Sequence, residues 1–221
     1  MDKIKIVEVK EDILLRNSTI GNELREELKK QGIFLLNVMS SPGSGKTTLL
    51  VNLINKLKGK YNIGVIEADL DSDVDAYTIK EKTGVRVMQM HTGGACHLTA
   101  QMVRDAINEF DLKNLNLVIL ENVGNLVCPA EFDTGSHANM VLLSVPEGDD
   151  KPLKYPLMFE VASFVVITKK DVAPVFDFDF DKVKDNIHLR NKKAEVFVTS
   201  ALNDDNVDEV ANHLTKLLDN F

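Results

Sequence analysis

The stretch SSPGSGKTT, at residues 40–48, limits the possible folds of this 221-residue chain more than any other feature. It follows the apolar run IFLLNVM, residues 33–39, which is typical of a buried strand. It leads into KTTLLVNLINKLKGK, residues 46–60, whose apolar spacing is typical of a helix. A glycine-rich turn between a strand and a helix presents backbone N–H groups and a helix N-terminus to phosphate. The sequence therefore predicts a P-loop.

The residues of this loop have separate predicted tasks. Gly43 and Gly45 let the backbone turn its N–H groups toward the phosphates. Lys46 is expected to reach the β and γ phosphates, and the Thr47 hydroxyl to bind Mg²⁺. Ser40 stands where the motif usually has its first glycine. The expected nucleotide-binding residues of the loop are Gly43, Ser44, Gly45, Lys46, Thr47 and Thr48.

Apolar runs alternate with amphipathic segments along the rest of the chain. Further strands are predicted at residues 62–68, 85–90, 116–122, 139–146, 163–169 and 194–200, and helices at 74–84, 97–110 and 207–221. Residues 173–185 are expected to form a surface loop that leads into a helix. This alternation predicts an α/β fold of the P-loop NTPase class, with a mostly parallel sheet covered by helices on both faces.

Residues 10–32 have helical spacing and many charges, and they precede the first strand. We therefore expect an N-terminal helical appendage at residues 1–32 and a nucleotide-binding domain at residues 33–221. The net charge of −8 argues against a nucleic-acid-binding surface. No run is long and apolar enough to span a bilayer, and residues 1–17 lack the apolar core of a signal peptide. The expected location is the cytoplasm.

Carboxylates follow two of the predicted strands. Four aspartates, Asp69, Asp71, Asp73 and Asp75, come after one strand, and Glu121 ends another. Some of these aspartates must cap the next helix. Since Mg²⁺ prefers oxygen ligands, the others are candidates for a metal site, with Asp75 as a switch residue. The expected Mg²⁺ ligands are Thr47, Asp69, Asp75 and Glu121, and the expected catalytic residues are Lys46, Asp69 and Glu121.

Two later strand ends carry a candidate base-binding site. The run VVITKKD ends with Lys169 and Asp171, and VTSA ends with Ser200 and Ala201. A carboxylate accepts two N–H bonds from guanine, whereas adenine would leave that charge unpaired. Lys169 can lie along the ring, and the Ala201 N–H can bind the guanine oxygen. These four residues predict GTP and GDP as ligands, although Thr168 replaces the asparagine usual in this motif.

The chain has two cysteines, Cys96 and Cys128, and His97 adjoins the first. Two sulfurs and one imidazole suit Zn²⁺ or Ni²⁺ and leave room for water or a group of a second subunit. The predicted helix after Cys96 would favour its thiolate. From spacing alone, two buried cysteines and a surface histidine are an equal alternative. The position of both cysteines in loops near the nucleotide favours the metal site.

Four stretches, MSSPGSGKTT, TGGACHL, ENVGNLVCPAEFD and LLSVPEGDDKPLKYP, together resemble the HypB family of hydrogenase maturation GTPases. The resemblance covers the chain from about Ile33 onward. It implies a SIMIBI-type G domain that dimerises around nucleotide, hydrolyses GTP and delivers nickel to the immature [NiFe]-hydrogenase large subunit. It places the family's metal ligands, for Zn²⁺ or Ni²⁺, on Cys96, His97 and Cys128, and its base-binding aspartate on Asp171. The partners it implies are a second copy of the chain, the nickel chaperone HypA and the precursor of the large subunit.

Some members carry an N-terminal cysteine motif or histidine-rich tract for nickel, and residues 1–32 have neither. Metal is therefore expected at the loop site, where Glu121 and Cys128 share one segment that can couple nucleotide to metal. Three alternatives stay open. They are a urease-type nickel-insertion GTPase, a P-loop ATP-dependent kinase, and a metal-binding module that holds GDP without catalysis.

Overall fold

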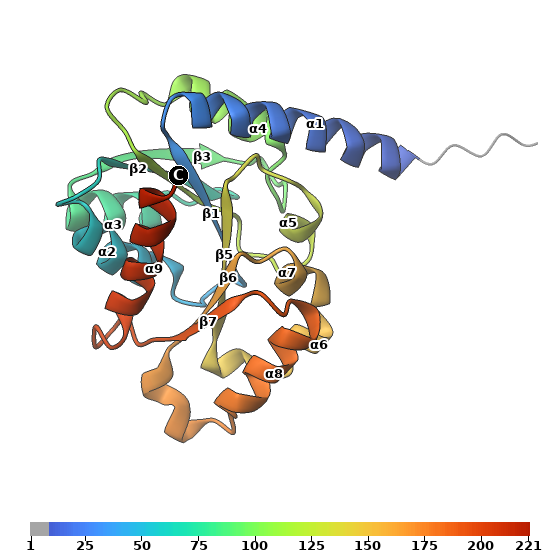
Figure 1. The fold of residues 1–221 in the computed structure, drawn as a ribbon, viewed down its shortest axis with the longest axis vertical. Helices are drawn as coiled ribbons and strands as arrows, with labels where there is room; N and C mark the ends of the chain where they lie inside the picture. Colours follow the sequence, from blue (N-terminus) through green and yellow to red (C-terminus); the bar gives the residue numbers. More distant parts are fainter. Residues whose placement is uncertain (1–8) are drawn as a thin grey trace, which may run out of the picture.

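The computed structural model describes residues 9–221, so the part of the predicted appendage at residues 1–8 lies outside the described residues. Seven strands form one sheet in the order β3-β2-β4-β1-β5-β6-β7, with every neighbouring pair parallel. The strands are β1 Phe34–Met39, β2 Ile63–Asp69, β3 Arg86–His91, β4 Leu117–Glu121, β5 Ala138–Ser144, β6 Phe164–Thr168 and β7 Glu195–Val198. Because all are parallel, their carboxyl ends meet at one edge of the sheet (Figure 1).

Helices connect the strands and cover both faces of the sheet. The longer ones are α1 Val9–Lys30, α2 Lys46–Leu57, α3 Val74–Thr83, α4 Ala100–Glu109, α8 Phe180–Arg190 and α9 Val207–Asp219. The short ones are α5 Cys128–Glu131, α6 Lys151–Lys154 and α7 Pro156–Glu160, with 3₁₀ turns η1 Val145–Glu147 and η2 Lys170–Val175. Within residues 9–221, no helix is both long and apolar enough to cross a membrane.

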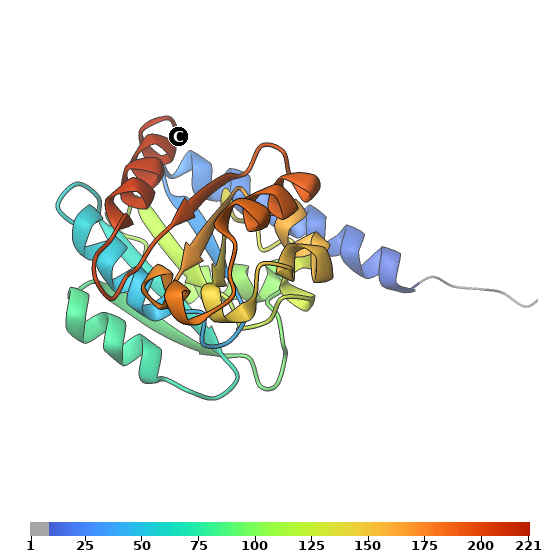
Figure 2. The ribbon, with the colours of Figure 1, turned by 90° about the horizontal axis from the view of Figure 1, so that it is seen from below.

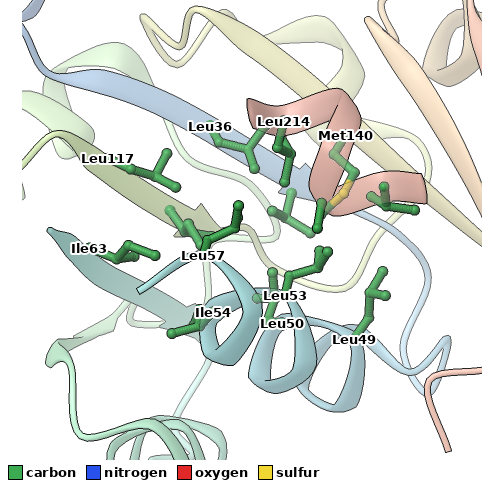
Figure 3. Close-up of a cluster of buried hydrophobic side chains, with 14 of the residues drawn as sticks. Leu36, Leu49, Leu50, Leu53, Ile54, Leu57, Ile63, Leu117, Met140 and Leu214 are labelled. Carbon is green, nitrogen blue, oxygen red and sulfur yellow. The ribbon is translucent and has the colours of Figure 1, made fainter. Parts of the chain in front are cut away.

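The face covered by α2, α3 and α9 holds the largest apolar cluster. Alternate β1 residues, such as Leu36 and Val38, point to this face and meet the buried side of α2. Figure 3 shows Leu50, Leu53 and Leu57 of α2 directed at the sheet. Their spacing of three and four residues puts them on one side of the helix, so packing fixes α2 and the loop before it.

Two further clusters fill the opposite face. Leu35 of β1 packs with α1 and α4, which lie side by side in Figure 1. Met39 of β1 packs with α5, α7 and α8. Figures 1 and 2 both show the N-terminal end of α1 projecting past the rest of the fold. Its C-terminal half is buried through Leu24 and Leu28, so this half of the predicted appendage helix contributes to the core.

Polar contacts fix α1 against the loop before β5. Arg25 donates to both carboxylate oxygens of Asp133, at 2.7 and 2.9 Å, and Asn17 donates to the Asp133 carbonyl at 2.8 Å. Gly21 lies beside the same carboxylate, because a Cβ added there would be 2.9 Å from Asp133 Oδ2. Asn17 also accepts the Ala100 N–H at 2.7 Å, which ties α1 to the start of α4.

The predicted strands and long helices are confirmed, with small shifts at their ends. The helix expected from residue 97 begins at Ala100, because the Thr99 hydroxyl caps it by accepting the Met102 N–H at 3.2 Å. The loop expected at 173–185 is shorter than predicted, because η2 extends to Val175 and α8 already begins at Phe180, capped by the Asp179 side chain. No helix was predicted for α5, α6 or α7, which are four or five residues long, each with a proline in its first turn. Such single turns are too short for a periodic pattern.

The Gly64→Ala variant tests the packing of the sheet against the loop after α4. A Cβ on Gly64 would lie 2.6 Å from Phe110 Cε1 and 2.8 Å from Leu115 Cδ1, both in buried side chains. We expect a loss of about 1–3 kcal/mol in the free energy of unfolding, measured in urea. The matched control is Gly59→Ala, where no atom lies within 4 Å. Equal unfolding free energies for the two variants would contradict this packing.

Candidate functional site

The P-loop lies between β1 and α2, where the sequence predicted it. Gly43 and Gly45 have positive φ angles of 72° and 93°, the conformation that glycine adopts without strain. Ser40, in place of the usual first glycine, is fully buried, and its hydroxyl accepts hydrogen bonds from Ser44 Oγ at 2.7 Å and Lys46 Nζ at 3.1 Å. Ser40 therefore holds the lysine that is expected to contact the phosphates.

A cavity of 320 Å³ adjoins the P-loop at the ends of β6 and β7. Gly45 and Thr48 line one side of it, and Lys169, Asp171 and Ala201 line the other. The structure thus brings together the residues of the predicted base-binding site. Ser200, also predicted there, donates its hydroxyl to Asp171 Oδ1 at 2.6 Å and so orients the carboxylate.

Three hydrogen bonds join this cavity to the P-loop and α2. Thr168 Oγ1 donates to the Ser44 carbonyl at 2.6 Å, and Lys169 Nζ donates to the Gly43 carbonyl at 2.6 Å. Asn52 of α2 donates to the Ala201 carbonyl at 2.6 Å. Thr168 is buried, so its hydroxyl supplies a fixed link between the two parts of the site. Thr168, in place of the usual asparagine, therefore contributes a hydrogen bond to the P-loop.

A cluster of carboxylates lies beside the P-loop. Glu67, Asp75 and Glu121 each place one oxygen within 4.8 Å of the others. Burial raises the pKa of Glu67 to about 7 and that of Glu121 to about 8. The charge of Lys46 acts in the opposite direction on both groups. Glu121 and Asp75 were expected near Mg²⁺, whereas Glu67 was not.

Asp69 and Thr47 complete the predicted Mg²⁺ set. Asp69 Oδ1 accepts the backbone N–H groups of Asp71 and Ser72 at 3.1 and 2.8 Å, which shapes the loop before α3. Burial alone would raise the Asp69 pKa, but these backbone bonds and Lys46 bring it below its usual range. Thr47 lies in the first turn of α2, half-buried. Their assignment as metal ligands stays a prediction.

Cys96, His97 and Cys128 lie together in one subunit. Each of the three places a ligand atom within 4.8 Å of the others, and Cys96 Sγ is 3.8 Å from His97 Nδ1. A hydrogen bond with Cys128 raises the pKa of Cys96. The expected stabilisation of the Cys96 thiolate by a helix N-terminus is wrong, because the next helix starts four residues later. Burial lowers the pKa of His97 and keeps its imidazole neutral, as metal binding requires.

Neighbouring side chains fix the positions of this cluster. The His97 ring stacks on Phe132, with centroids 4.0 Å apart and an interplanar angle of 23°. Asn125 Nδ2 donates to the Cys96 carbonyl at 3.3 Å and so joins the segment after β4 to the loop that carries Cys96 and His97. The sequence analysis missed both residues, although they stand in the quoted stretch ENVGNLVCPAEFD.

The segment from Glu121 to Cys128 also contacts the P-loop. A Cβ added at Gly124 would lie 3.1 Å from both the backbone nitrogen and Cγ of Pro42, so a larger residue would have to displace the P-loop by a few tenths of an ångström. On the other side of the loop, the Ser41 hydroxyl donates to Glu147, whose second oxygen accepts the Ser144 N–H at 2.8 Å. The P-loop is thus held between the ends of β4 and β5.

His137, which lies near these loops in the sequence, has a structural role. Its Nδ1 accepts the Leu35 N–H at 2.9 Å, and its Nε2 lies 3.0 Å from the Arg25 carbonyl. These contacts indicate a neutral ring with the proton on Nε2, and burial lowers the pKa of His137 accordingly. His137 joins α1 to β1.

Comparisons with known proteins show the family of the chain. Residues 34–198 match the family described as CobW/HypB/UreG, nucleotide-binding domain. The chain is 44% identical to the hydrogenase maturation factor HypB of Rhizobium leguminosarum bv. viciae, over 91% of this chain and 67% of that protein. It is 42% identical to the hydrogenase/urease maturation factor HypB of Helicobacter pylori strain 26695, over 95% of this chain and 87% of that protein.

A solved structure gives the same result. The crystal structure of HypB from Helicobacter pylori in complex with nickel superimposes with a TM-score of 0.86 at 41% identity, covering 93% of this chain and 96% of that one. This likeness confirms the predicted P-loop fold of the SIMIBI type. The chain therefore belongs to the HypB family of hydrogenase maturation factors, within the family of CobW/HypB/UreG nucleotide-binding domains.

Proposed function

We propose that this protein is a GTP-hydrolysing metallochaperone that delivers nickel to the immature large subunit of [NiFe]-hydrogenase. One observation carries the proposal. The Cys96, His97 and Cys128 ligand atoms lie within 4.8 Å of one another, and the segment that brings Cys128 there begins at Glu121 beside the P-loop. Membership in the HypB family and the nickel complex of the Helicobacter pylori relative support nickel as the cargo. Zn²⁺ would fit the same donor set.

The nucleotide would lie along the P-loop with its base in the cavity beside Asp171. Lys46 and the backbone N–H groups of residues 43–48 would bind the phosphates. The buried carboxylate oxygens Glu67 Oε2 and Glu121 Oε2 have no hydrogen-bond partner among the described residues, which suits a site for Mg²⁺. Thr47, Asp69, Asp75 and Glu121 would hold this ion, which neutralises charge on the transferred phosphoryl group. Catalysis would then rest on positioning by Lys46, Asp69 and Glu121.

Nickel release would follow from a change of the segment between Glu121 and Cys128. Contact with the γ-phosphate and its ion would favour one position of this segment, and GDP another. Each position gives Cys128 a different place relative to Cys96 and His97. A second copy of the chain, joined in the GTP state, would supply further ligands. HypA and the large-subunit precursor are the proposed donor and recipient in the cytoplasm. The division into an N-terminal appendage at residues 1–32 and a GTPase domain at residues 33–221 is part of the same proposal.

A urease-type role is a second candidate, because the Helicobacter pylori relative carries the name hydrogenase/urease maturation factor. The site chemistry would be the same, and only the recipient of nickel would differ. An ATP-dependent kinase is a weaker alternative, since adenine offers no N–H pair to the Asp171 carboxylate. A module that binds GDP without turnover would release no phosphate from GTP.

The Asp171→Asn variant tests the base-binding site. An amide cannot accept both guanine N–H bonds, so we expect GTP affinity to fall by about 100-fold, or about 2.7 kcal/mol. Xanthosine triphosphate, which offers a carbonyl in place of the amino group, should bind this variant better than the parent. Affinities would be measured by calorimetry, with Asp177→Asn, an exposed residue, as the control. A parent protein that binds ATP as tightly as GTP would support the kinase alternative instead.

The His97→Ala variant tests the cargo site. Loss of one of three ligands should weaken nickel binding by at least about tenfold, or about 1.4 kcal/mol. The control is His188→Ala, whose exposed ring lies on α8. Nickel would be titrated into the parent and both variants, each with GDP and with a non-hydrolysable GTP analogue. Equal nickel affinities of the parent with the two nucleotides would rule out coupling, and unchanged affinity of His97→Ala would rule out this ligand set.

A further inference from the structure

We propose that Glu67 is a ligand of the magnesium site, beside Glu121 and Asp75, and that it makes the protein select the magnesium complex of the nucleotide over the free nucleotide. This inference rests on the proposed GTPase function and deepens it. Nothing in the sequence motifs pointed to Glu67, because it stands inside the apolar strand run IGVIEAD.

The sheet itself places the two glutamates side by side. Glu67 of β2 and Glu121 of β4 are direct partners in the parallel register. Val65 and Ile119, two residues earlier on these strands, both belong to the cluster under α2 and α3. Since strand residues two apart share a face, both glutamates point to the face where α2 begins. Asp75, in the first turn of α3, is the third carboxylate of the group and comes from outside the sheet.

A cation would stabilise the buried carboxylate oxygens of this group. Glu67 is 3% exposed and Glu121 is 1% exposed, and one oxygen of each has no hydrogen-bond partner among the described residues. A buried oxygen left without a partner costs roughly 1–3 kcal/mol, more when it is charged. Glu67, Asp75 and Glu121 each place one carboxylate oxygen within 4.8 Å of the others, and together they form an oxygen site of the kind that Mg²⁺ prefers.

Lys46 cannot satisfy this group alone when nucleotide is present. Its Nζ is hydrogen-bonded to Ser40 and faces the position expected for the β and γ phosphates. The phosphates bring further negative charge next to Glu67, Asp75 and Glu121, which must then either repel the phosphates or take up protons, and both cost free energy in a buried site. A divalent cation between the carboxylates and the phosphates converts this repulsion into attraction. The carboxylates should therefore lower the affinity for nucleotide that is not bound to a cation.

A purely structural Glu67 would behave differently. If the carboxyl group only fills space beside Gln89, the amide of Glu67→Gln has the same shape and should leave the magnesium dependence unchanged. If Glu67 binds the cation, the same substitution removes a ligand and also removes a repulsive charge. The substitution should then weaken nucleotide binding with magnesium and cause no loss of binding without it.

The experiment measures the affinity of a fluorescent GDP for the parent, Glu67→Gln and the control Glu109→Gln, in EDTA and across a magnesium titration. Glu109 is exposed at the end of α4, away from the site. We expect magnesium to tighten binding by the parent and by the control equally. In Glu67→Gln the gain from magnesium should shrink by about tenfold or more, while binding in EDTA should be as tight as in the parent or tighter.

A gain from magnesium equal to that of the parent would overturn the proposal. Weaker binding in EDTA, or a lowered unfolding temperature that accompanies a loss under both conditions, would also overturn it in favour of a structural role. Direct Mn²⁺ binding to the GDP complex, followed by electron paramagnetic resonance, gives a second readout, and Glu67→Gln should lower the Mn²⁺ affinity. Failure of the parent to bind guanine nucleotide at all would instead refute the proposed function.

Discussion

The parallel pairing of β1 with β4 is the constraint on which the rest of the site depends. It continues past the strands, where the Asn122 N–H donates to the Val38 carbonyl at 2.9 Å and the Asn122 side chain donates to Asn37. The P-loop follows β1 and the segment bearing Cys128 follows β4, so the pairing of these strands places the two segments side by side. The close contact of Gly124 with Pro42 follows directly.

The fold class was predictable because each strand and long helix is defined by local spacing and turn chemistry. The P-loop could be placed by its flanks alone, and its two glycines adopt the conformation that the motif requires. Thr168 shows what a comparison of residue types in a sequence motif cannot reveal. The sequence shows only that an asparagine is missing, whereas the structure shows a hydroxyl that donates to the same loop at 2.6 Å. A buried threonine hydroxyl is thus a hydrogen-bond donor to the P-loop at this position.

Other features depend on contacts between segments far apart in the chain. Glu67 looks like one polar residue in an apolar run until the register with β4 puts Glu121 next to it. Phe132 looks like an ordinary aromatic residue until its ring is found against His97. The short turns of α5 to α7 give no periodic signal, although α5 begins at Cys128 itself. Such juxtapositions come from sheet topology, which a single sequence specifies only indirectly.

The contact between Gly124 and Pro42 would also let the metal site act on the nucleotide site. Suppose that bound phosphates alter this contact, shift Cys128 and so change the affinity for the metal ion. Metal binding must then change the affinity for nucleotide by the same factor, because linkage between two binding equilibria is reciprocal. Cargo loading would then set how tightly GDP or GTP is bound. An empty carrier and a loaded carrier would differ in their affinity for nucleotide, and this difference would give the cell a signal that metal has been collected.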